Sequence, residues 1–119
     1  MAQALRTLGV PYRWGGSDPV GGLDCSGLVQ WSYHQLGVEL PRTTAGQINA
    51  GVAVDASALR PGDLIFTRGG PAGSVHDGGH VAIYAGGGME IAAPYSGQVV
   101  SLRPVRPERI QEVRRIIGW

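Results

Sequence analysis

One cysteine and three histidines are the side chains of this sequence best suited to nucleophilic chemistry. Cys25 is the only cysteine, and it follows Asp24, a favourable residue at the N-cap of a helix. In the first turn of a helix, free N–H groups and the helix dipole favour the reactive thiolate over the thiol. A lone cysteine is more often a small buried hydrophobic residue, but Ser26 and Gly27 provide little apolar cover. The sequence therefore favours a reactive Cys25.

A cysteine nucleophile needs a base within hydrogen-bonding reach, and the candidates are His34, His76 and His80. His34 lies in the same expected helix as Cys25, at a separation of roughly 13 Å for a rise of about 1.5 Å per residue. His76 lies in a glycine-flanked stretch that is typical of a solvated loop. His80 begins the apolar strand HVAIYA, where an unpartnered polar side chain is costly unless it borders a cleft. His80 is therefore the best candidate for the base.

A third group usually orients the imidazole of such a base, and Glu90 in the next expected strand is the candidate. We expect a hairpin in which Tyr84 pairs with Gly88. In this register Ala92 lies opposite His80, and an alanine cannot orient an imidazole. Glu90 is a diagonal neighbour of His80 on the same face of the hairpin. A solvated carboxylate on an exposed strand face is an equally good interpretation of Glu90.

The elements that must position these side chains are short helices followed by strands. Helical patterns cover residues 2–9 and 25–36, and a third short helix begins at Thr43 or Thr44 and ends at Gly51. Strand patterns follow, separated by turns that contain glycine or proline, at 63–67, 80–85, 88–92 and 98–103. The C-terminal segment 108–119 fits a helix or a closing strand equally well. Helices followed by an antiparallel meander predict an α+β fold.

The composition describes a single small globular domain. The chain has 119 residues and 20 glycines, with 10 Lys and Arg against 9 Asp and Glu. The basic residues form no stripe for nucleic acid, and no apolar run approaches the roughly 20 residues that span a membrane. The first residues lack the pattern of an export signal. We expect one domain over residues 1–119 that acts as a monomer without nucleic acid or membrane partners.

Five blocks of the sequence resemble, in the same order, the NlpC family of bacterial cell-wall endopeptidases, which have a papain-like α+β fold. The blocks are LGVPYRWGG, LDCSGLVQWSY, LPRTTAGQ, LRPGDLIF and GHVAIYAGGGMEIAAP. The resemblance implies a single NlpC-type peptidase domain over residues 1–119. It also implies hydrolysis of the amide between the γ-carboxyl group of D-glutamate and a diamino acid, commonly meso-diaminopimelate, in peptidoglycan stem peptides. Such a protein would act at the bacterial cell wall, as a secreted hydrolase or as part of a phage lysin or tail.

The resemblance assigns roles to individual residues. Cys25 matches the nucleophile of the family, and His80 matches the base. Tyr12, Asp24 and Ser26 match positions that shape the environment of the oxyanion and of the substrate amine. Tyr12 could equally be a packing aromatic residue.

The third catalytic position of the family departs from its usual pattern in this chain. That position is usually His, and in some members Glu, Asn or Gln; here it is Ala92, which could be natural or introduced. A one-residue bulge would bring Glu90 nearer as a substitute.

We expect a peptidase of reduced activity that needs no cofactor. We also expect no metal, because His76 and His80 have no third clustered ligand. A non-catalytic peptidoglycan-binding or assembly module is the alternative, and a papain-like acyltransferase or amidase is a further one.

Overall fold

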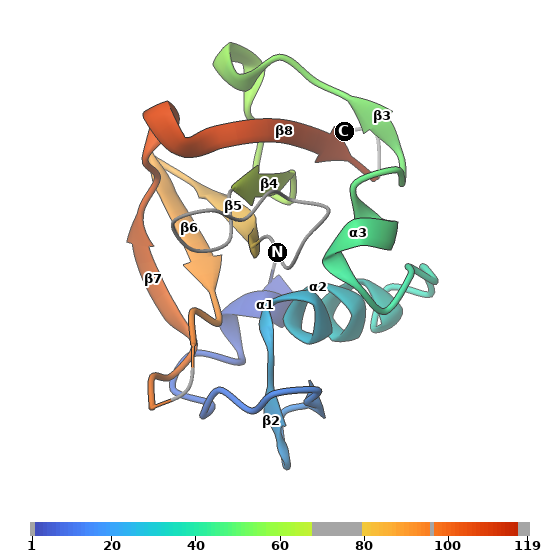
Figure 1. Cartoon of the computed structure of the whole chain (residues 1–119), viewed down its shortest axis with the longest axis vertical. Helices are drawn as coiled ribbons and strands as arrows, with labels where there is room; N and C mark the ends of the chain where they lie inside the picture. The colour runs from blue at the N-terminus through green and yellow to red at the C-terminus, as the bar shows by residue number, and fades with distance from the viewer. Residues whose placement is uncertain (1, 68–79, 96, 117–119) are drawn as a thin grey trace.

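A six-stranded antiparallel sheet forms the centre of the molecule, and three short helices lie along one side of it (Figure 1). The computed structural model describes residues 2–67, 80–95 and 97–116. The helices are α1 (Ala2–Leu5), α2 (Cys25–His34) and α3 (Thr44–Gln47). The strands are β1 (Ser17–Asp18), β2 (Gly22–Leu23), β3 (Val52–Ala53), β4 (Leu64–Thr67), β5 (His80–Gly86), β6 (Met89–Ala92), β7 (Ser101–Pro104) and β8 (Ile110–Arg115). The predicted α+β fold is confirmed.

The predicted meander corresponds to β4, β5, β6 and β7, which are neighbours in the sheet in that order. The C-terminal segment, which fitted a helix or a strand, contributes β8. This strand pairs with β4, and Val113 lies buried opposite Ile65. The two-residue strand β3 pairs with β8 at the sheet edge, while β1 and β2 form a separate hairpin. These two-residue strands are too short to show alternation in the sequence.

The predicted register between β5 and β6 is wrong by two residues. Tyr84 pairs with Glu90 rather than with Gly88, and the register shifts between Tyr84 and Gly86. The cause is the run of three glycines at 86–88, all of which have positive φ angles. This left-handed backbone places the turn at Gly87 and Gly88, between the pair Gly86 and Met89, and a bulge between Tyr84 and Gly86 shifts the register. A shift of two residues keeps Glu90 on the face of His80, but Ala92 no longer lies directly opposite His80.

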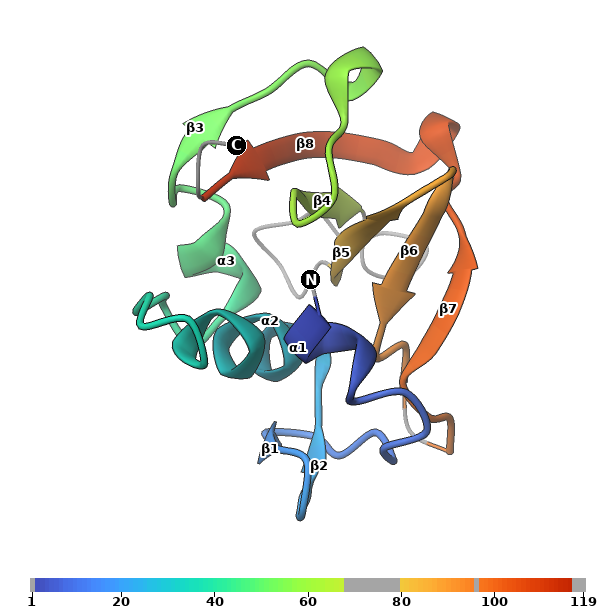
Figure 2. The ribbon, with the colours of Figure 1, turned by 180° about the vertical axis from the view of Figure 1, so that it is seen from behind.

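Helix α2 lies beside the sheet in both views of the ribbon (Figures 1 and 2) and contacts β5. Its buried residues Leu28, Val29 and Tyr33 join one core cluster with sheet residues such as Phe66 and Ile83. This packing fixes the start of α2, where Cys25 lies, relative to β5. No helix in the described part of the chain is long and apolar enough to cross a membrane.

Candidate active site

Cys25 is the first residue of α2, and Asp24 caps the helix as predicted. The Oδ1 atom of Asp24 accepts a hydrogen bond from the backbone N–H of Gly27 at 2.7 Å. Gly27 is needed here, because a Cβ atom at this position would collide with the carbonyl oxygen of Gly16. The start of the helix therefore packs directly against the backbone of the preceding loop. Cys25 itself is partly buried and packs against the edge of the core cluster.

An ion pair between Asp24 and Arg42 holds the segments around Cys25 together. Arg42 donates to Asp24 from Nη1 to Oδ1 at 3.1 Å and from Nη2 to Oδ2 at 3.0 Å. Nη2 also donates to the carbonyl oxygen of Gly16 at 3.0 Å. The Oδ2 atom of Asp24 accepts a further hydrogen bond from the N–H of Gly15. Asp24 is thus committed to the helix cap, the loop and Arg42 at once.

Ser26 belongs to the same network. Its hydroxyl accepts from Arg42 Nη1 at 2.9 Å and donates to Asp24 Oδ1 at 3.3 Å, and the residue is buried. The side chains of Asp24 and Ser26 therefore act on the site mainly by fixing the helix start and the guanidinium of Arg42. Arg42 could not be identified from the sequence, because nothing in LPRTTAGQ shows that its side chain reaches back to α2.

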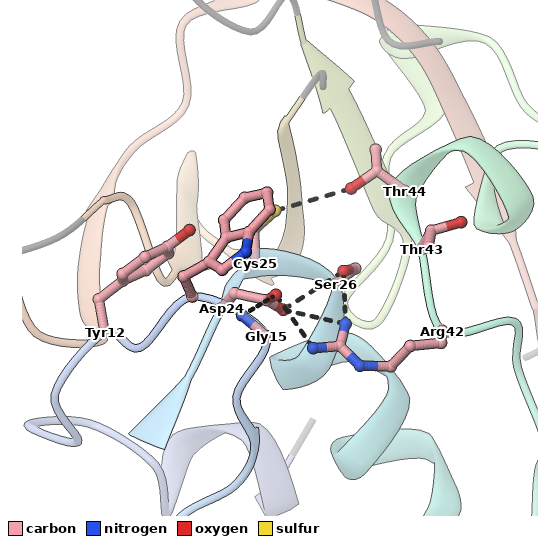
Figure 3. A pocket seen from close by; sticks show the side chains of 9 residues that line it. Tyr12, Gly15, Asp24, Cys25, Ser26, Arg42, Thr43 and Thr44 are labelled. Carbon is pink, nitrogen blue, oxygen red and sulfur yellow. Dashed lines mark hydrogen bonds and ion pairs between the residues drawn. The ribbon is translucent and has the colours of Figure 1, made fainter. Parts of the chain in front are cut away.

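Cys25 opens into a cavity of about 360 Å³ between the loop before β1, the start of α2 and the start of α3 (Figure 3). Its lining residues are Tyr12, Trp14, Gly15, Asp24, Cys25, Ser26, Arg42, Thr43 and Thr44. The structure thus brings together four of the predicted site residues, namely the nucleophile and the three substrate-binding candidates. His80 is not among the residues that line this cavity.

Thr44 contacts the predicted nucleophile and was not identified from the sequence. Its Oγ1 lies 3.6 Å from Cys25 Sγ, and either group can be the donor. Thr44 is the first residue of α3 and is buried. Its hydroxyl can donate to a thiolate at Cys25, and hydrogen bonds to charged groups are stronger than those between neutral groups.

We expect Thr44→Val to slow alkylation of Cys25 by iodoacetamide at pH 7 about threefold to tenfold, because the thiolate loses a donor worth about 1 kcal/mol or more. Thr44→Ser keeps the hydroxyl and is the matched control, with a rate close to that of the unmodified protein. Equal rates for the valine and serine variants would show that the Thr44 hydroxyl does not stabilise the thiolate.

Tyr12 lies in the same cavity and keeps its proton at neutral pH. Burial raises the pKa of Tyr12, the nearby Cys25 and Asp24 raise it further, and Arg42 acts in the opposite direction. In the view of Figure 3, Tyr12 and Thr44 lie on either side of Cys25. A protonated phenol at this position is a hydrogen-bond donor that an oxyanion or a substrate carbonyl can use.

His80 is the first residue of β5, and its side chain interacts with Arg103 of β7. Nη2 of Arg103 lies 3.0 Å from His80 Nε2. Burial, and secondarily Arg103, lowers the pKa of His80 to about 4. No hydrogen bond joins His80 to Cys25 in the part of the chain that the structure describes. Of the other histidines, His34 is exposed and pairs with Glu39, and His76 lies outside the described residues.

Glu90 is buried, so its interpretation as a solvated carboxylate is wrong. Its Oε2 atom accepts a hydrogen bond from Arg103 Nε at 2.8 Å. Burial raises the pKa of Glu90, while Arg103 acts against this rise. Among the residues that the structure describes, Glu90 is therefore connected to His80 through Arg103. Ala92 is fully buried and pairs with Ser101.

Arg103 was missed because its importance depends on strand pairing. It lies at the end of a predicted strand, opposite Glu90 in the observed register. The cross-strand pairing of opposite charges would have identified it, had the sequence shown the register. Among residues 2–67, 80–95 and 97–116, no cluster of three His, Cys, Asp or Glu side chains could hold a metal ion.

Residues 9–116 match the model of the NlpC/P60 family. The bifunctional muramidase/DL-endopeptidase CwlT of Bacillus subtilis is 43% identical over 97 residues, which cover 82% of this chain and 29% of CwlT. The peptidoglycan endopeptidase RipA of Mycobacterium tuberculosis is 39% identical over 116 residues, which cover 87% of this chain and 23% of RipA. The chain thus spans less than a third of the length of these two relatives.

Solved structures agree with this match. The peptidoglycan hydrolase RipB of Mycobacterium tuberculosis superposes with a TM-score of 0.86 and 34% identity, over 99% of this chain and 63% of the RipB chain. Structures of RipA mutated at a cysteine, a histidine and a glutamate also give TM-scores of 0.86, with 33–35% identity and coverage of 99% of this chain and 60% of theirs. The mutated histidine and glutamate of RipA lie twelve residues apart. Twelve residues after His80, this chain has Ala92.

Proposed function

Because the chain belongs to the NlpC/P60 family, we propose that it is a cysteine endopeptidase of peptidoglycan stem peptides, acting on the amide between the γ-carboxyl group of D-glutamate and meso-diaminopimelate. The observation that carries the proposal is the position of Cys25 at the capped start of α2, in a cavity that Tyr12 and Thr44 also line. The relatives CwlT and RipA are both named as endopeptidases, which supports the reaction class. The choice of the γ-D-glutamyl bond as the one cleaved is based on the resemblance of the sequence blocks to the family.

In the proposed first step, Cys25 Sγ attacks the γ-glutamyl carbonyl carbon after its proton has moved to His80. The S–C bond forms, and the carbonyl π electrons move to the oxygen. Backbone N–H groups at the start of α2 and the hydroxyl of Tyr12 stabilise the resulting oxyanion. When the tetrahedral intermediate collapses, the C–N bond breaks and the leaving amine takes the proton from His80.

In the second step, water hydrolyses the acyl-enzyme. His80 accepts a proton from the water, whose oxygen bonds to the carbonyl carbon as the S–C bond breaks. The products are the γ-carboxyl group and the free amine, and Cys25 and His80 return to their initial states. Asp24 and Ser26 contribute by holding the start of α2 in place through Arg42.

The proposed setting follows from the substrate. We propose that residues 1–119 form one peptidase domain that works as a monomer at the bacterial cell wall, either secreted or as part of a phage lysin or tail protein. The family match over residues 9–116 supports one domain.

We expect slow but measurable cleavage of diaminopimelate-type muropeptides, because Ala92 cannot orient His80. Ala92→Glu is expected to raise kcat/KM at least about tenfold, since losing an orienting group costs about 10⁴-fold in the serine-protease template. Cleavage is followed by mass spectrometry of the products. Ala92 is fully buried, so circular dichroism spectra must first show that the variant is folded, and Ala92→His provides a second variant of different shape.

Ala92 also favours a second candidate function, a peptidoglycan-binding or assembly module that has lost turnover. Such a module would bind stem peptide, cleave none and leave Cys25 unreactive toward iodoacetamide at pH 7. Turnover that appears only in the Ala92→Glu or Ala92→His variant would contradict residual activity in the unmodified chain and support this module.

A further inference from the structure

The strongest unassigned feature of the site is the side chain of Arg103, which bridges Glu90 and His80. Arg103 lies opposite Glu90 across β6 and β7 and donates to its carboxylate from Nε at 2.8 Å. Its Nη2 lies 3.0 Å from His80 Nε2. The Glu90 side chain is 6% exposed and the Arg103 side chain 39% exposed. A buried carboxylate thus holds the guanidinium against the predicted base.

The chemistry of the guanidinium fixes the protonation of His80 in this contact. Arginine has only donors and remains charged in proteins, so His80 Nε2 must be the acceptor. A neutral imidazole has one donor and one acceptor nitrogen, so the proton of His80 is on Nδ1. An imidazolium ion has no acceptor and would also meet the positive charge of Arg103. The contact therefore selects the neutral ring with its proton on Nδ1.

The other groups around His80 do not oppose this selection. In the described strands packed against it, β4 places the neutral Thr67 opposite His80, and β6 contributes Glu90, whose carboxylate is bonded to Arg103. Burial, and next Arg103, lowers the pKa of His80 to about 4. The ring is therefore neutral at pH 7, in agreement with the geometry of the hydrogen bond.

The polarity of this contact is opposite to that of a catalytic triad. In the triad template, a carboxylate accepts from one ring N–H and leaves the other nitrogen free to take a proton. Here a cation occupies the only lone pair of His80 that could accept the proton of Cys25. The observed arrangement is therefore unable to carry out the proton transfer of the proposed reaction.

We propose that Arg103 is a positioning residue that holds His80 in the neutral form with the proton on Nδ1, so that the base is available only after the guanidinium leaves Nε2. The effect on catalysis rests on the proposed function, whereas the protonation of His80 does not. In this resting arrangement Glu90 acts through Arg103, as the carboxylate that keeps it in place.

The test is the NMR signature of the His80 ring nitrogens in ¹⁵N-labelled protein at pH 7, assigned by its loss in a His80→Gln variant. We expect the unmodified protein to carry the proton on Nδ1. Arg103→Met keeps an unbranched side chain without donors, and its His80 is expected to show a large share of the form with the proton on Nε2. A proton on Nε2 or on both nitrogens in the unmodified protein, or an unchanged signature in Arg103→Met, would overturn the proposal.

The second readout is alkylation of Cys25 by iodoacetamide at pH 7, expected to be at least about fivefold faster in Arg103→Met because His80 can then accept the thiol proton. An unchanged or slower rate would count against the proposal. Arg106→Met is the matched control: Arg106 lines the same cavity of about 510 Å³ as Arg103, and its loss should leave the His80 signature and the rate unchanged.

Arg103→Met leaves Glu90 buried without its cation, which can prevent folding. The double variant Glu90→Gln, Arg103→Met removes this charge and is expected to show the same change at His80 and the same faster alkylation. Neither readout requires turnover. If the protein cleaves no stem peptide, but His80 carries its proton on Nδ1 and the variants lose this form, only the proposed function is refuted. If the enzyme is active and His80 carries its proton on Nε2, only the role of Arg103 is refuted.

Discussion

Replacing Cys25 by alanine is expected to reduce stem-peptide cleavage to below about one-thousandth of the unmodified rate while the protein stays folded. Removal of the nucleophile from a serine protease lowers kcat by about 10⁶-fold. Because we expect the unmodified protein to cleave slowly, a smaller fold-loss than this can be measured here. Cys25 is only partly buried and borders the cavity, so its loss should change the unfolding free energy by less than about 1 kcal/mol. Product quantification by mass spectrometry and thermal unfolding measure the two effects.

Cys25→Ser is the companion variant. It keeps a hydroxyl within reach of Thr44 but loses the acidity of the thiol, so it should be almost as inactive as the alanine variant. Retention of more than about a tenth of the activity by Cys25→Ala would exclude Cys25 as the nucleophile.

Replacing Asp24 by alanine is expected to lower the unfolding free energy by about 2 to 4 kcal/mol and to remove most of the activity. The change removes a helix cap worth about 1 kcal/mol and leaves the guanidinium of Arg42 without its carboxylate. Because the Arg42 side chain is one-third exposed, water screens its charge and reduces the loss of unfolding free energy. Urea unfolding measures the stability, and cleavage assays under folding conditions measure the activity.

Asp55→Ala is the matched control for this change. Asp55 also caps a helical turn, through Ser57, but it is exposed and no ion pair joins it to an arginine among the residues that the structure describes. We expect Asp55→Ala to lower the unfolding free energy much less than Asp24→Ala does and to leave the activity unchanged. The variant Asp24→Asn keeps a capping side chain without the charge. Its loss of unfolding free energy should lie between those of Asp24→Ala and Asp55→Ala. Equal losses for the alanine variants at Asp24 and Asp55 would mean that the ion pair with Arg42 contributes nothing.

The local part of the site could be predicted from the sequence. The cap at Asp24 and the first-turn position of Cys25 depend on neighbours within three residues, and the strand of His80 depends on apolar residues that follow it directly. Such features are encoded by residue type and spacing. For the same reason the α+β order of elements was predicted correctly.

The side chains that surround Cys25 and His80 could not be predicted in the same way. Arg42 and Thr44 reach the start of α2 only through the tertiary packing of α3, and Arg103 reaches His80 only in the observed strand register. That register depends on the backbone angles of Gly86 and its two following glycines, which sequence spacing does not reveal. Contacts between distant segments thus account for most of what was missed.

The hydrogen bonds of Arg42 have a consequence for the order in which the protein matures. They tie together segments that are 16 to 26 residues apart in the chain, and closing such loops costs conformational entropy that isolated helix formation does not. The surroundings of Cys25 therefore assemble with the tertiary fold rather than with α2 alone. An incompletely folded chain carries the thiol but not the cleft, so the proposed hydrolysis would begin only when folding is complete.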